Sequence, residues 1–353
     1  MEQATIQEIL EINEHPNADA LELATILGWQ VVIKKDQFKV GDKVVYVGLD
    51  SILPPHEAFE FLAKQKYRIK TAKLRGEMSY GIVFSMGTLI NVAIEQYRRD
   101  HLISLDVPVG HDFDHINIGD DVTEVMGVKK YEKPVPKCQD AKGGFPTTIL
   151  RKTDEERVQN IPHILDEIGD REIYITVKAD GSSLTVLKVD DELSVCSRNL
   201  LLKEPESIHS ASNFWAVTYK YGLDEIPSGY YVQAELIGPS IQSNPHGVDS
   251  LEIRVFNVGI IRKGNTQLPL DYDDMVTFCN YHNLPMTELV YRGKKNFETI
   301  DDLEEIANAV RYENGKIGEG VVIRYTESED DFKMQKPLSF KMISPKYALK
   351  HGE

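Results

Sequence analysis

The stretch that most constrains this chain runs from residue 173 to residue 183. Apolar and polar residues alternate from Ile173 to Val177, which is the pattern of a β-strand with one buried face. Lys178 closes the polar face just before an Asp180-Gly181 turn, and a second alternating run begins at Leu184. We therefore expect a hairpin that presents one lysine at a strand end and one carboxylate two residues later. Taken alone, the pattern is more typical of an ordinary surface hairpin than of a catalytic lysine.

Further stretches change that interpretation, because they follow in the order of one enzyme superfamily. Lys178-Ala179-Asp180-Gly181 resembles the nucleotidyl-lysine motif of the covalent nucleotidyltransferases, which include DNA ligases, RNA ligases and mRNA capping enzymes. The stretches similar to the later motifs of that superfamily are Ser197-Arg198-Asn199, 233–238, 254–258, 319–324 and 339–344. Together the matches cover residues 150 to 350.

Residues 1 to 125 predict a small β domain. Short alternating runs at 21–27, 29–35, 44–47 and 80–84 are separated by turns such as Gly41-Asp42, which is typical of a β-barrel. The His15 to Asp19 stretch resembles OB-folds of the tRNA-binding type.

An OB domain ahead of a nucleotidyltransferase domain resembles RNA ligase family 5. The resemblance implies an α+β protein with an N-terminal OB-fold β-barrel (1–125), a Pro- and Gly-containing linker (126–148) and an adenylyltransferase domain (149–353). The last is of the ATP-grasp-like ligase type, with antiparallel sheets flanked by helices. The chain ends just past Lys350, so we expect no domain after the last motif, which disfavours DNA ligases and capping enzymes.

Several helices are expected in the second domain. A capping box from Thr153 to Glu156 predicts a helix or a pair of helices that leads into it, interrupted near Pro162. Two more are expected at 271–282 and 299–311.

The chemistry of the superfamily explains why these residue types recur. A lysine that attacks a nucleotide phosphate must be neutral, and with a reference pKa near 10.4 its deprotonation at pH 7 costs about 4–5 kcal/mol. The site must offset that cost with positive charge, a metal ion or burial. The resemblance implies that Lys178 is the catalytic nucleophile. It also implies that Asp180, Glu235 and Glu319 hold the water shell of Mg²⁺ or Mn²⁺, which carboxylate oxygens suit.

The resemblance also implies which residues bind ATP. These are Val177, Lys178, Gly181, Arg198, Glu235, Phe256, Glu319, Lys341 and Lys346. Arg198 would contact the ribose and Phe256 would stack on adenine. The structural alternatives are a surface salt bridge for Arg198 and core packing for Phe256.

The last motif departs from the Lys-x-Lys of many ligases. Either Lys341 is the first lysine and Ile343 replaces the second, or Lys341 is the second and Ser339 replaces the first. The sequence therefore does not identify the residue that supplies the second phosphate-contacting cation, and Lys346 is another candidate for this region.

A basic run in the first domain is the candidate nucleic-acid surface. Lys66, Arg68 and Lys70 alternate, so in a strand they would share one face, and Lys73 and Arg75 extend the run. The pattern fits either a solvated edge strand or a groove that follows a phosphate backbone. The net charge of −16 argues against a nucleic-acid coat protein but not against a local basic patch.

The whole chain is of ordinary globular composition, with 41% hydrophobic and 27% charged residues. It shows neither a signal peptide nor an apolar run long enough to span a bilayer, and its three cysteines are scattered. We expect a monomeric protein of the cytoplasm or nucleus.

The function expected from the resemblance is ATP-dependent joining of RNA 3′-OH and 5′-phosphate ends through a lysyl-AMP intermediate. The substrate would be RNA or an RNA-containing duplex, sealed at a nick. One alternative is a DNA ligase or a capping guanylyltransferase of the same superfamily. The other is a catalytically silent RNA-binding OB protein, against which the set of Lys178, Asp180, Glu235 and Glu319 argues.

Overall fold

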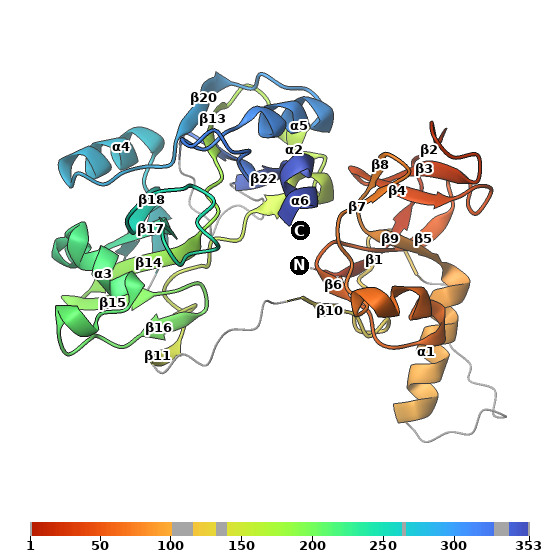
Figure 1. The fold of residues 1–353 in the computed structure, drawn as a ribbon, viewed down its shortest axis with the longest axis horizontal. Helices are drawn as coiled ribbons and strands as arrows, with labels where there is room; N and C mark the ends of the chain where they lie inside the picture. Colours follow the sequence, from red (N-terminus) through yellow and green to blue (C-terminus); the bar gives the residue numbers. More distant parts are fainter. Residues whose placement is uncertain (1, 101–115, 132–139, 263–265, 328–338, 352–353) are drawn as a thin grey trace. The chain divides into compact units, whose positions relative to one another are not determined.

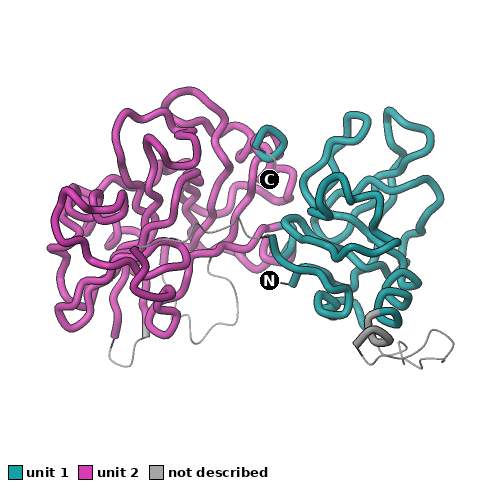
Figure 2. Tube along the Cα trace, turned by 60° about the horizontal axis from the view of Figure 1, so that its bottom comes forward, with its two compact units in different colours: residues 1–135, 159–162, 348–353 teal, residues 136–158, 163–347 magenta. Residues whose placement is uncertain are grey.

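The computed structural model describes residues 2–100, 116–131, 140–262, 266–327 and 339–351 (Figure 1). The chain divides into two compact units (Figure 2). Unit 1 comprises residues 1–135, 159–162 and 348–353, and unit 2 comprises residues 136–158 and 163–347. In the part of the chain that the structure describes, no helix is both long and apolar enough to cross a membrane.

Unit 1 is built from short antiparallel strands. They are β1 (Ala4–Glu8), β2 (Glu11–Glu14), β3 (Leu21–Ile26), β4 (Trp29–Lys34), β5 (Lys43–Val47), β6 (Ser51–Ile52), β7 (Ala72–Leu74), β8 (Glu77–Ser79), β9 (Ile82–Ser85) and β10 (Lys129–Lys130). They pair in the orders β1-β5-β9, β2-β3-β4, β6-β10 and β7-β8. The strands predicted at 21–27, 29–35, 44–47 and 80–84 are confirmed with small shifts at their ends.

The core of unit 1 lies on both sides of β5. Val45 and Val47 pack into one apolar cluster, whereas Val44 and Tyr46 pack into a second one. Alternate side chains of a strand point to opposite faces, so a strand apolar at both sets of positions is buried on both faces. The first cluster includes Met126 and Val128, so the start of the segment predicted as a linker is part of this core.

Unit 2 contains two sheets. Its strands are β11 (Ala141–Gly144), β12 (Glu156–Arg157), β13 (Glu172–Val177), β14 (Ser182–Val189), β15 (Glu192–Cys196), β16 (Leu200–Leu202), β17 (Tyr230–Ile237), β18 (Glu252–Arg262), β19 (Thr266–Pro269), β20 (Leu289–Lys294), β21 (Gly320–Tyr325) and β22 (Ser339–Ile343). The seven-stranded sheet has the order β11-β16-β15-β14-β17-β18-β19, and the five-stranded sheet has the order β12-β22-β21-β13-β20. Among the described strands of unit 2, the β12–β22 pair is parallel and the other pairs are antiparallel, as predicted for these sheets.

The helices are of modest length. The α-helices are α1 (Met86–Asp100), α2 (Ile164–Glu167), α3 (Asn213–Lys220), α4 (Tyr272–Tyr281), α5 (Ile300–Ala309) and α6 (Pro345–His351), and the 3-10 helices are η1 (Glu57–Gln65), η2 (Val158–Asn160), η3 (Ile208–Ser210) and η4 (Leu223–Glu225). The predicted helices at 271–282 and 299–311 are confirmed as α4 and α5. A capping box starts α5, because Thr299 and Asp302 each bond the other's backbone N–H.

Helices α3 and α4 cover one face of the seven-stranded sheet (Figure 1). Trp215 of α3 and Met275 of α4 share a core with Val232, Ala234 and Leu236 of β17. The predicted apolar face of β17 is therefore confirmed, and Glu235 lies on the opposite face.

The helix start predicted from the capping box at 153–156 is wrong, because residues 151–155 are irregular and Glu156 and Arg157 form β12. Two short helices follow, η2 and α2, and Pro162 lies between them, so the predicted pair of helices interrupted near Pro162 is confirmed. The two residues inside the predicted capping box form ion pairs, Asp154 with Arg198 and Glu155 with Arg324. Such pairs can outweigh the modest stability of a helix cap.

The predicted hairpin between residues 173–177 and 184–189 is also wrong. Strand β13 pairs with β20 and β21, whereas β14 pairs with β15 and β17. Each strand therefore has both edges occupied in its own sheet. The Lys178–Gly181 segment carries the chain from one sheet of unit 2 to the other.

Candidate active site

The Lys178–Gly181 segment is held at the junction of the two sheets of unit 2. The N–H of Lys178 donates to the carbonyl oxygen of Gly320 over 2.8 Å, and Ser183 pairs with Glu235 in the next sheet. A Cβ on Gly181 would lie 2.2 Å from the carbonyl oxygen of Leu236. Only glycine permits this close approach, so the crossing requires Gly181 for packing.

Lys178 and Glu319 form an ion pair at this junction. Lys178 Nζ lies 2.7 Å from Glu319 Oε1, and the two side chains are 25% and 8% exposed. Val322 of β21 is the register partner of Lys341. Strict alternation along β21 would place Glu319 with the buried Val321, on the face opposite to Val322 and Lys341. Gly320, between Glu319 and Val321, has φ +150°, and a Cβ there would lie 2.1 Å from the carbonyl oxygen of Met342. This glycine conformation breaks the alternation and lets Glu319 reach Lys178.

Glu235 brings a third carboxyl group to the site. Burial raises the pKa of Glu235 to about 8, with Glu319 and Asp180 adding to the rise and Lys178 opposing it. The structure therefore brings together the three predicted metal-binding carboxyl groups and the predicted nucleophile.

These three carboxyl groups fit a cation held through water. Across the described ranges, no three His, Cys, Asp or Glu side chains converge closely enough to ligate a metal directly. A buried carboxyl group with a pKa of about 8 would return to its ionised form beside a divalent cation, because such an ion dominates the local charge.

Two buried tyrosines contact the Lys178–Gly181 segment. The Tyr312 hydroxyl donates to the carbonyl oxygen of Lys178 over 3.2 Å and accepts the N–H of Glu319 over 3.0 Å. The Tyr347 hydroxyl donates to Asp180 Oδ2. Burial raises the pKa of both tyrosines, so both hydroxyls keep their protons near neutral pH.

Lys341 joins this cluster from β22. Burial, together with the positive charges of Lys178 and Arg157, lowers the pKa of Lys341 to about 8. Arg157 is the register partner of Lys341 in the β12–β22 pair. Ile343, where a second lysine was considered, is buried.

Phe256 lies beside a charged pair. The guanidinium carbon of Arg324 is 5.5 Å from the centre of the Phe256 ring, and Arg324 also bonds Glu155. The negative charge of Glu155 is maintained there: its burial raises the pKa, but Arg324 and neighbouring cations lower it below its ordinary value.

Three other predicted nucleotide-binding residues have different surroundings. Arg198 is 59% exposed and lies 2.7 Å from Asp154. Lys346 is exposed on α6, where its charge acts on Glu304 of α5. Val177 has a buried side chain, and its N–H donates to the carbonyl oxygen of Glu288 over 2.9 Å.

The basic run of unit 1 does not form the predicted strand. Lys66 ends η1 with φ 54°, and Tyr67 follows with φ 59°. Two consecutive left-handed residues turn the chain and interrupt the alternation. Lys66, Lys70, Lys73 and Arg75 are exposed.

Arg68 differs from its neighbours in this run. Its guanidinium lies 2.6 Å from Asp50 and 3.6 Å from the centre of the Tyr131 ring, and its side chain is 15% exposed.

Sequence reasoning missed Tyr312, Tyr347, Glu155 and Arg324 as parts of the site. Arg324 and Tyr347 lie in or beside motif stretches, which is a signal that could have found them. Tyr312 sits in a turn seven residues before Glu319, and no sequence pattern marks it.

Comparisons with known proteins agree with this arrangement. A family model described as an OB-fold domain matches residues 3–86, and one described as RNA ligase matches residues 171–343. The chain is similar in structure to the RNA ligase of Naegleria gruberi with PPi, with 28% identity, TM-score 0.81 and coverage of 99% of each chain. A mutant of that ligase with ATP and Mn is 30% identical, with TM-score 0.79 and the same coverage.

Among curated proteins, the chain matches the phenylalanine–tRNA ligase beta subunit of Halalkalibacterium halodurans. The two are 25% identical over 312 residues, which is 85% of this chain and 32% of the relative. The same subunit from Geobacter metallireducens is 28% identical over 130 residues, covering 35% of this chain and 15% of the relative. The chain therefore spans a third or less of the length of these curated relatives.

The comparisons confirm the predicted N-terminal OB-fold and the α+β architecture that follows it. The chain matches the RNA ligase family model and is 30% identical to a solved RNA ligase over nearly its whole length. The chain therefore belongs to the RNA ligase family.

Proposed function

We propose that this chain is an ATP-dependent RNA ligase that joins an RNA 3′-OH end to a 5′-phosphate end. The observation that carries the proposal is the lysine of the nucleotidyl-lysine motif, Lys178, held 2.7 Å from Glu319 with Lys341 close by. The solved relatives support ATP as the substrate, since the Naegleria gruberi RNA ligase structures include ones with ATP and Mn and with AMP and Mn.

The proposed reaction has three steps. Lys178 Nζ loses a proton and bonds the α-phosphorus of ATP, while the bond from that phosphorus to pyrophosphate breaks. The AMP then passes from the lysine to a 5′-phosphate. Finally the RNA 3′-OH attacks that phosphate and AMP leaves.

The side chains of the site suit the first step. The contact with Glu319 holds Nζ in one orientation, but the negative charge of Glu319 favours the protonated amine. That charge would be offset when Glu319 helps to hold a divalent cation. Lys341 and Arg157 place positive charge beside Lys178, which would stabilise the charge that develops on the phosphates. Phe256, exposed in part on β18, is our candidate to stack on adenine.

Asp180, Glu235 and Glu319 are our candidates to hold Mg²⁺ or Mn²⁺ through its water shell. When bound, the metal would neutralise charge on the α-phosphate and oppose protonation of a nearby lysine.

The polynucleotide is proposed to be nicked duplex RNA or an RNA-containing duplex. Arg198 and Lys346 are exposed cations of unit 2 that could contact nucleotide or RNA. In unit 1, exposed Lys66, Lys70, Lys73 and Arg75 are our candidates for phosphate contacts. Arg68, also predicted for this role, is engaged with Asp50 and is the weakest candidate of the run.

The first experiment tests the nucleotide. Protein freed of bound AMP is incubated with Mn²⁺ and ATP or GTP labelled at the α-phosphate, and is then separated by denaturing electrophoresis. We expect a labelled band from ATP only, lost in Lys178→Ala. A band from GTP would favour a guanylyltransferase, and no band with either nucleotide would favour a silent RNA-binding protein.

The second experiment tests the polynucleotide. Nicked duplexes with a ribose or a deoxyribose at the 3′-OH end are compared with single strands carrying the same ends. Sealing that depends on the terminal ribose would support an RNA ligase, and equal sealing of both duplexes would favour a DNA ligase.

A further inference from the structure

We propose that Tyr312 and Tyr347 are positioning residues that hold the Lys178–Asp180 segment in place for adenylylation of the lysine. The inference rests on the function proposed above and concerns how the nucleophile is oriented.

Tyr312 links the two partners of the central ion pair through their backbones. Its hydroxyl donates to the carbonyl oxygen of Lys178 over 3.2 Å and accepts the N–H of Glu319 over 3.0 Å. One oxygen atom therefore sets the spacing between the residues whose side chains meet at 2.7 Å. Tyr312 is 4% exposed, so water cannot readily replace these bonds.

Tyr347 acts on the other end of the same segment. It lies in the first turn of α6, is 1% exposed and donates its hydroxyl hydrogen to Asp180 Oδ2. This bond fixes the rotamer of Asp180 and, through it, the backbone two residues after Lys178. The two hydroxyls thus restrain both ends of the crossing between the sheets.

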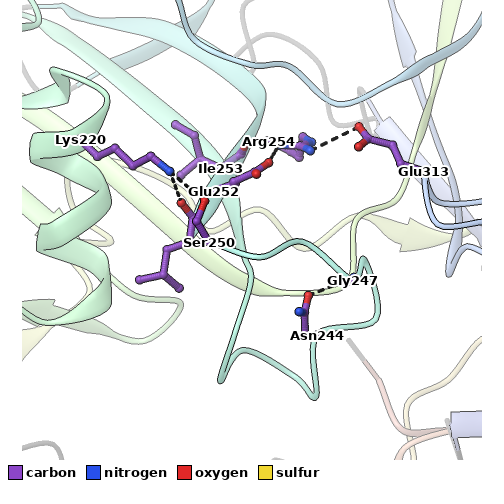
Figure 3. A network of polar contacts seen from close by, with 9 residues as sticks. Lys220, Asn244, Gly247, Ser250, Glu252, Ile253, Arg254 and Glu313 are labelled. Carbon is purple, nitrogen blue, oxygen red and sulfur yellow. Dashed lines mark hydrogen bonds and ion pairs between the residues drawn. The ribbon is translucent and has the colours of Figure 1, made fainter.

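Tyr312 is itself held by contacts that do not involve Lys178. The centre of its ring is 3.9 Å from the centre of the His246 ring. Two residues later, Asn314 donates to the carbonyl oxygen of Pro245 over 2.9 Å. Glu313, between Tyr312 and Asn314 in the chain, lies 3.4 Å from Arg254, whose other terminal nitrogen lies 2.8 Å from Glu252 (Figure 3). The turn at 312–314 is therefore fixed on the loop that joins β17 to β18.

This arrangement matters because the Lys178–Gly181 segment lies between two sheets. A residue within a sheet is held by its ladder, but the crossing residues depend on other contacts. A nucleophile must reach its target within a narrow range of distance and angle, so small displacements lower the rate.

The test uses Tyr312→Phe, Tyr347→Phe and the double variant. Tyr46→Phe is a matched control in unit 1, since the buried Tyr46 hydroxyl also donates to a backbone carbonyl, that of Tyr80, over 3.3 Å. Single-turnover formation of the labelled lysine adduct is measured over a range of ATP concentrations at saturating Mn²⁺. Thermal unfolding of each variant is measured alongside.

We expect each tyrosine variant to lose about tenfold in rate at saturating ATP, the size of one well-placed hydrogen bond. The ATP concentration for half-maximal rate should change by less than about twofold, as should both parameters in Tyr46→Phe. The double variant should lose about 100-fold if the two restraints act independently.

Two results would overturn the inference. One is a rate at saturating ATP equal to that of the unmodified protein in both single variants. The other is a loss that appears only at temperatures where the variant unfolds. An unmodified protein that forms no adduct would instead contradict the proposed function itself.

Discussion

In unit 2 the charged residues of the candidate site are largely enclosed and paired, whereas in unit 1 the basic residues between 66 and 75 are mostly exposed. The Lys178 and Glu319 side chains are 25% and 8% exposed, and the pKa values of Glu235 and Lys341 are both moved to about 8. Lys66, Lys70, Lys73 and Arg75 have open surroundings. Burial shifts the pKa of a charged group, whereas an exposed group keeps its charge and attracts opposite charges with a strength that salt reduces.

Arg68 is the exception within unit 1 that clarifies this contrast. It belongs to the basic run by sequence, but its guanidinium lies between Asp50 and the Tyr131 ring. We therefore expect Arg68 to act on stability and its exposed neighbours to act on RNA affinity.

The largest effect is expected where an enclosed charge is removed from unit 2. Glu319→Gln keeps the shape of the side chain but removes one of the carboxylates proposed to hold the metal, and the rate of lysine adenylylation should fall about 100- to 1,000-fold. Glu192→Gln is the control, because Glu192 is 74% exposed and pairs with the exposed Lys142. If Glu319→Gln formed the adduct at the same rate as Glu192→Gln, the enclosed carboxylate would be no more important to the reaction than an exposed one, which would contradict the contrast between the units.

The next effect is on the stability of unit 1. Arg68→Gln should lower its free energy of unfolding by about 2 kcal/mol, because a partly buried charged hydrogen bond is lost. Lys66→Gln should change it by less than about 0.5 kcal/mol. Urea unfolding is followed by Trp29 fluorescence in a Trp215→Phe background, since the chain has two tryptophans. Equal losses in both variants would show that Arg68 is no different from its neighbours.

The third effect is a pH dependence from Lys341. Its pKa is lowered to about 8, so the folded protein loses this positive charge as pH rises through 8. Affinity for an ATP analogue that cannot be cleaved after the α-phosphate should then fall, approaching about tenfold per pH unit. Calorimetry from pH 7.5 to 9.5 checks this, and Lys341→Met should bind more weakly at pH 7.5 with a flatter dependence.

The same group has an opposite effect on stability. Above pH 8 the unfolded chain still carries the Lys341 proton, up to an ordinary pKa of about 10.4. Over that window the unfolded state binds more protons than the folded state, so the contribution of Lys341 to stability rises with pH. A Lys341→Met variant whose stability followed the same pH curve as the unmodified protein would contradict the shift.

The smallest effect is expected from one exposed lysine of unit 1. Lys73→Gln should weaken RNA binding about fivefold and reduce the slope of log affinity against log salt by about one, while the lysine adduct forms at an unchanged rate. Filter binding at several salt concentrations measures the slope. Arg68→Gln, compared under conditions where it is folded, should leave the slope unchanged, and a slope reduced as in Lys73→Gln would place Arg68 among the phosphate contacts.

The amino-acid sequence by itself determined the local features of this protein. Alternation predicted β13 and the two faces of β17, because side-chain direction along a strand depends only on neighbouring residues. Apolar spacing predicted the helix at 299–311 for a similar reason, and the structure has α5 there. Motif order brought Lys178, Asp180, Glu235 and Glu319 into one hypothesis, and the structure brings these residues together.

Tertiary structure decided which strands pair and which distant side chains complete the site. Residues 173–177 and 184–189 have the pattern of a hairpin, but partners from β20, β21, β15 and β17 draw the two strands into different sheets. Residues 153–156 have the pattern of a capping box, but Arg198 and Arg324 bind Asp154 and Glu155 within it. Tyr312 reaches Lys178 across 134 positions of sequence. Local patterns cannot encode such contacts, because their free energy depends on residues that only folding brings together.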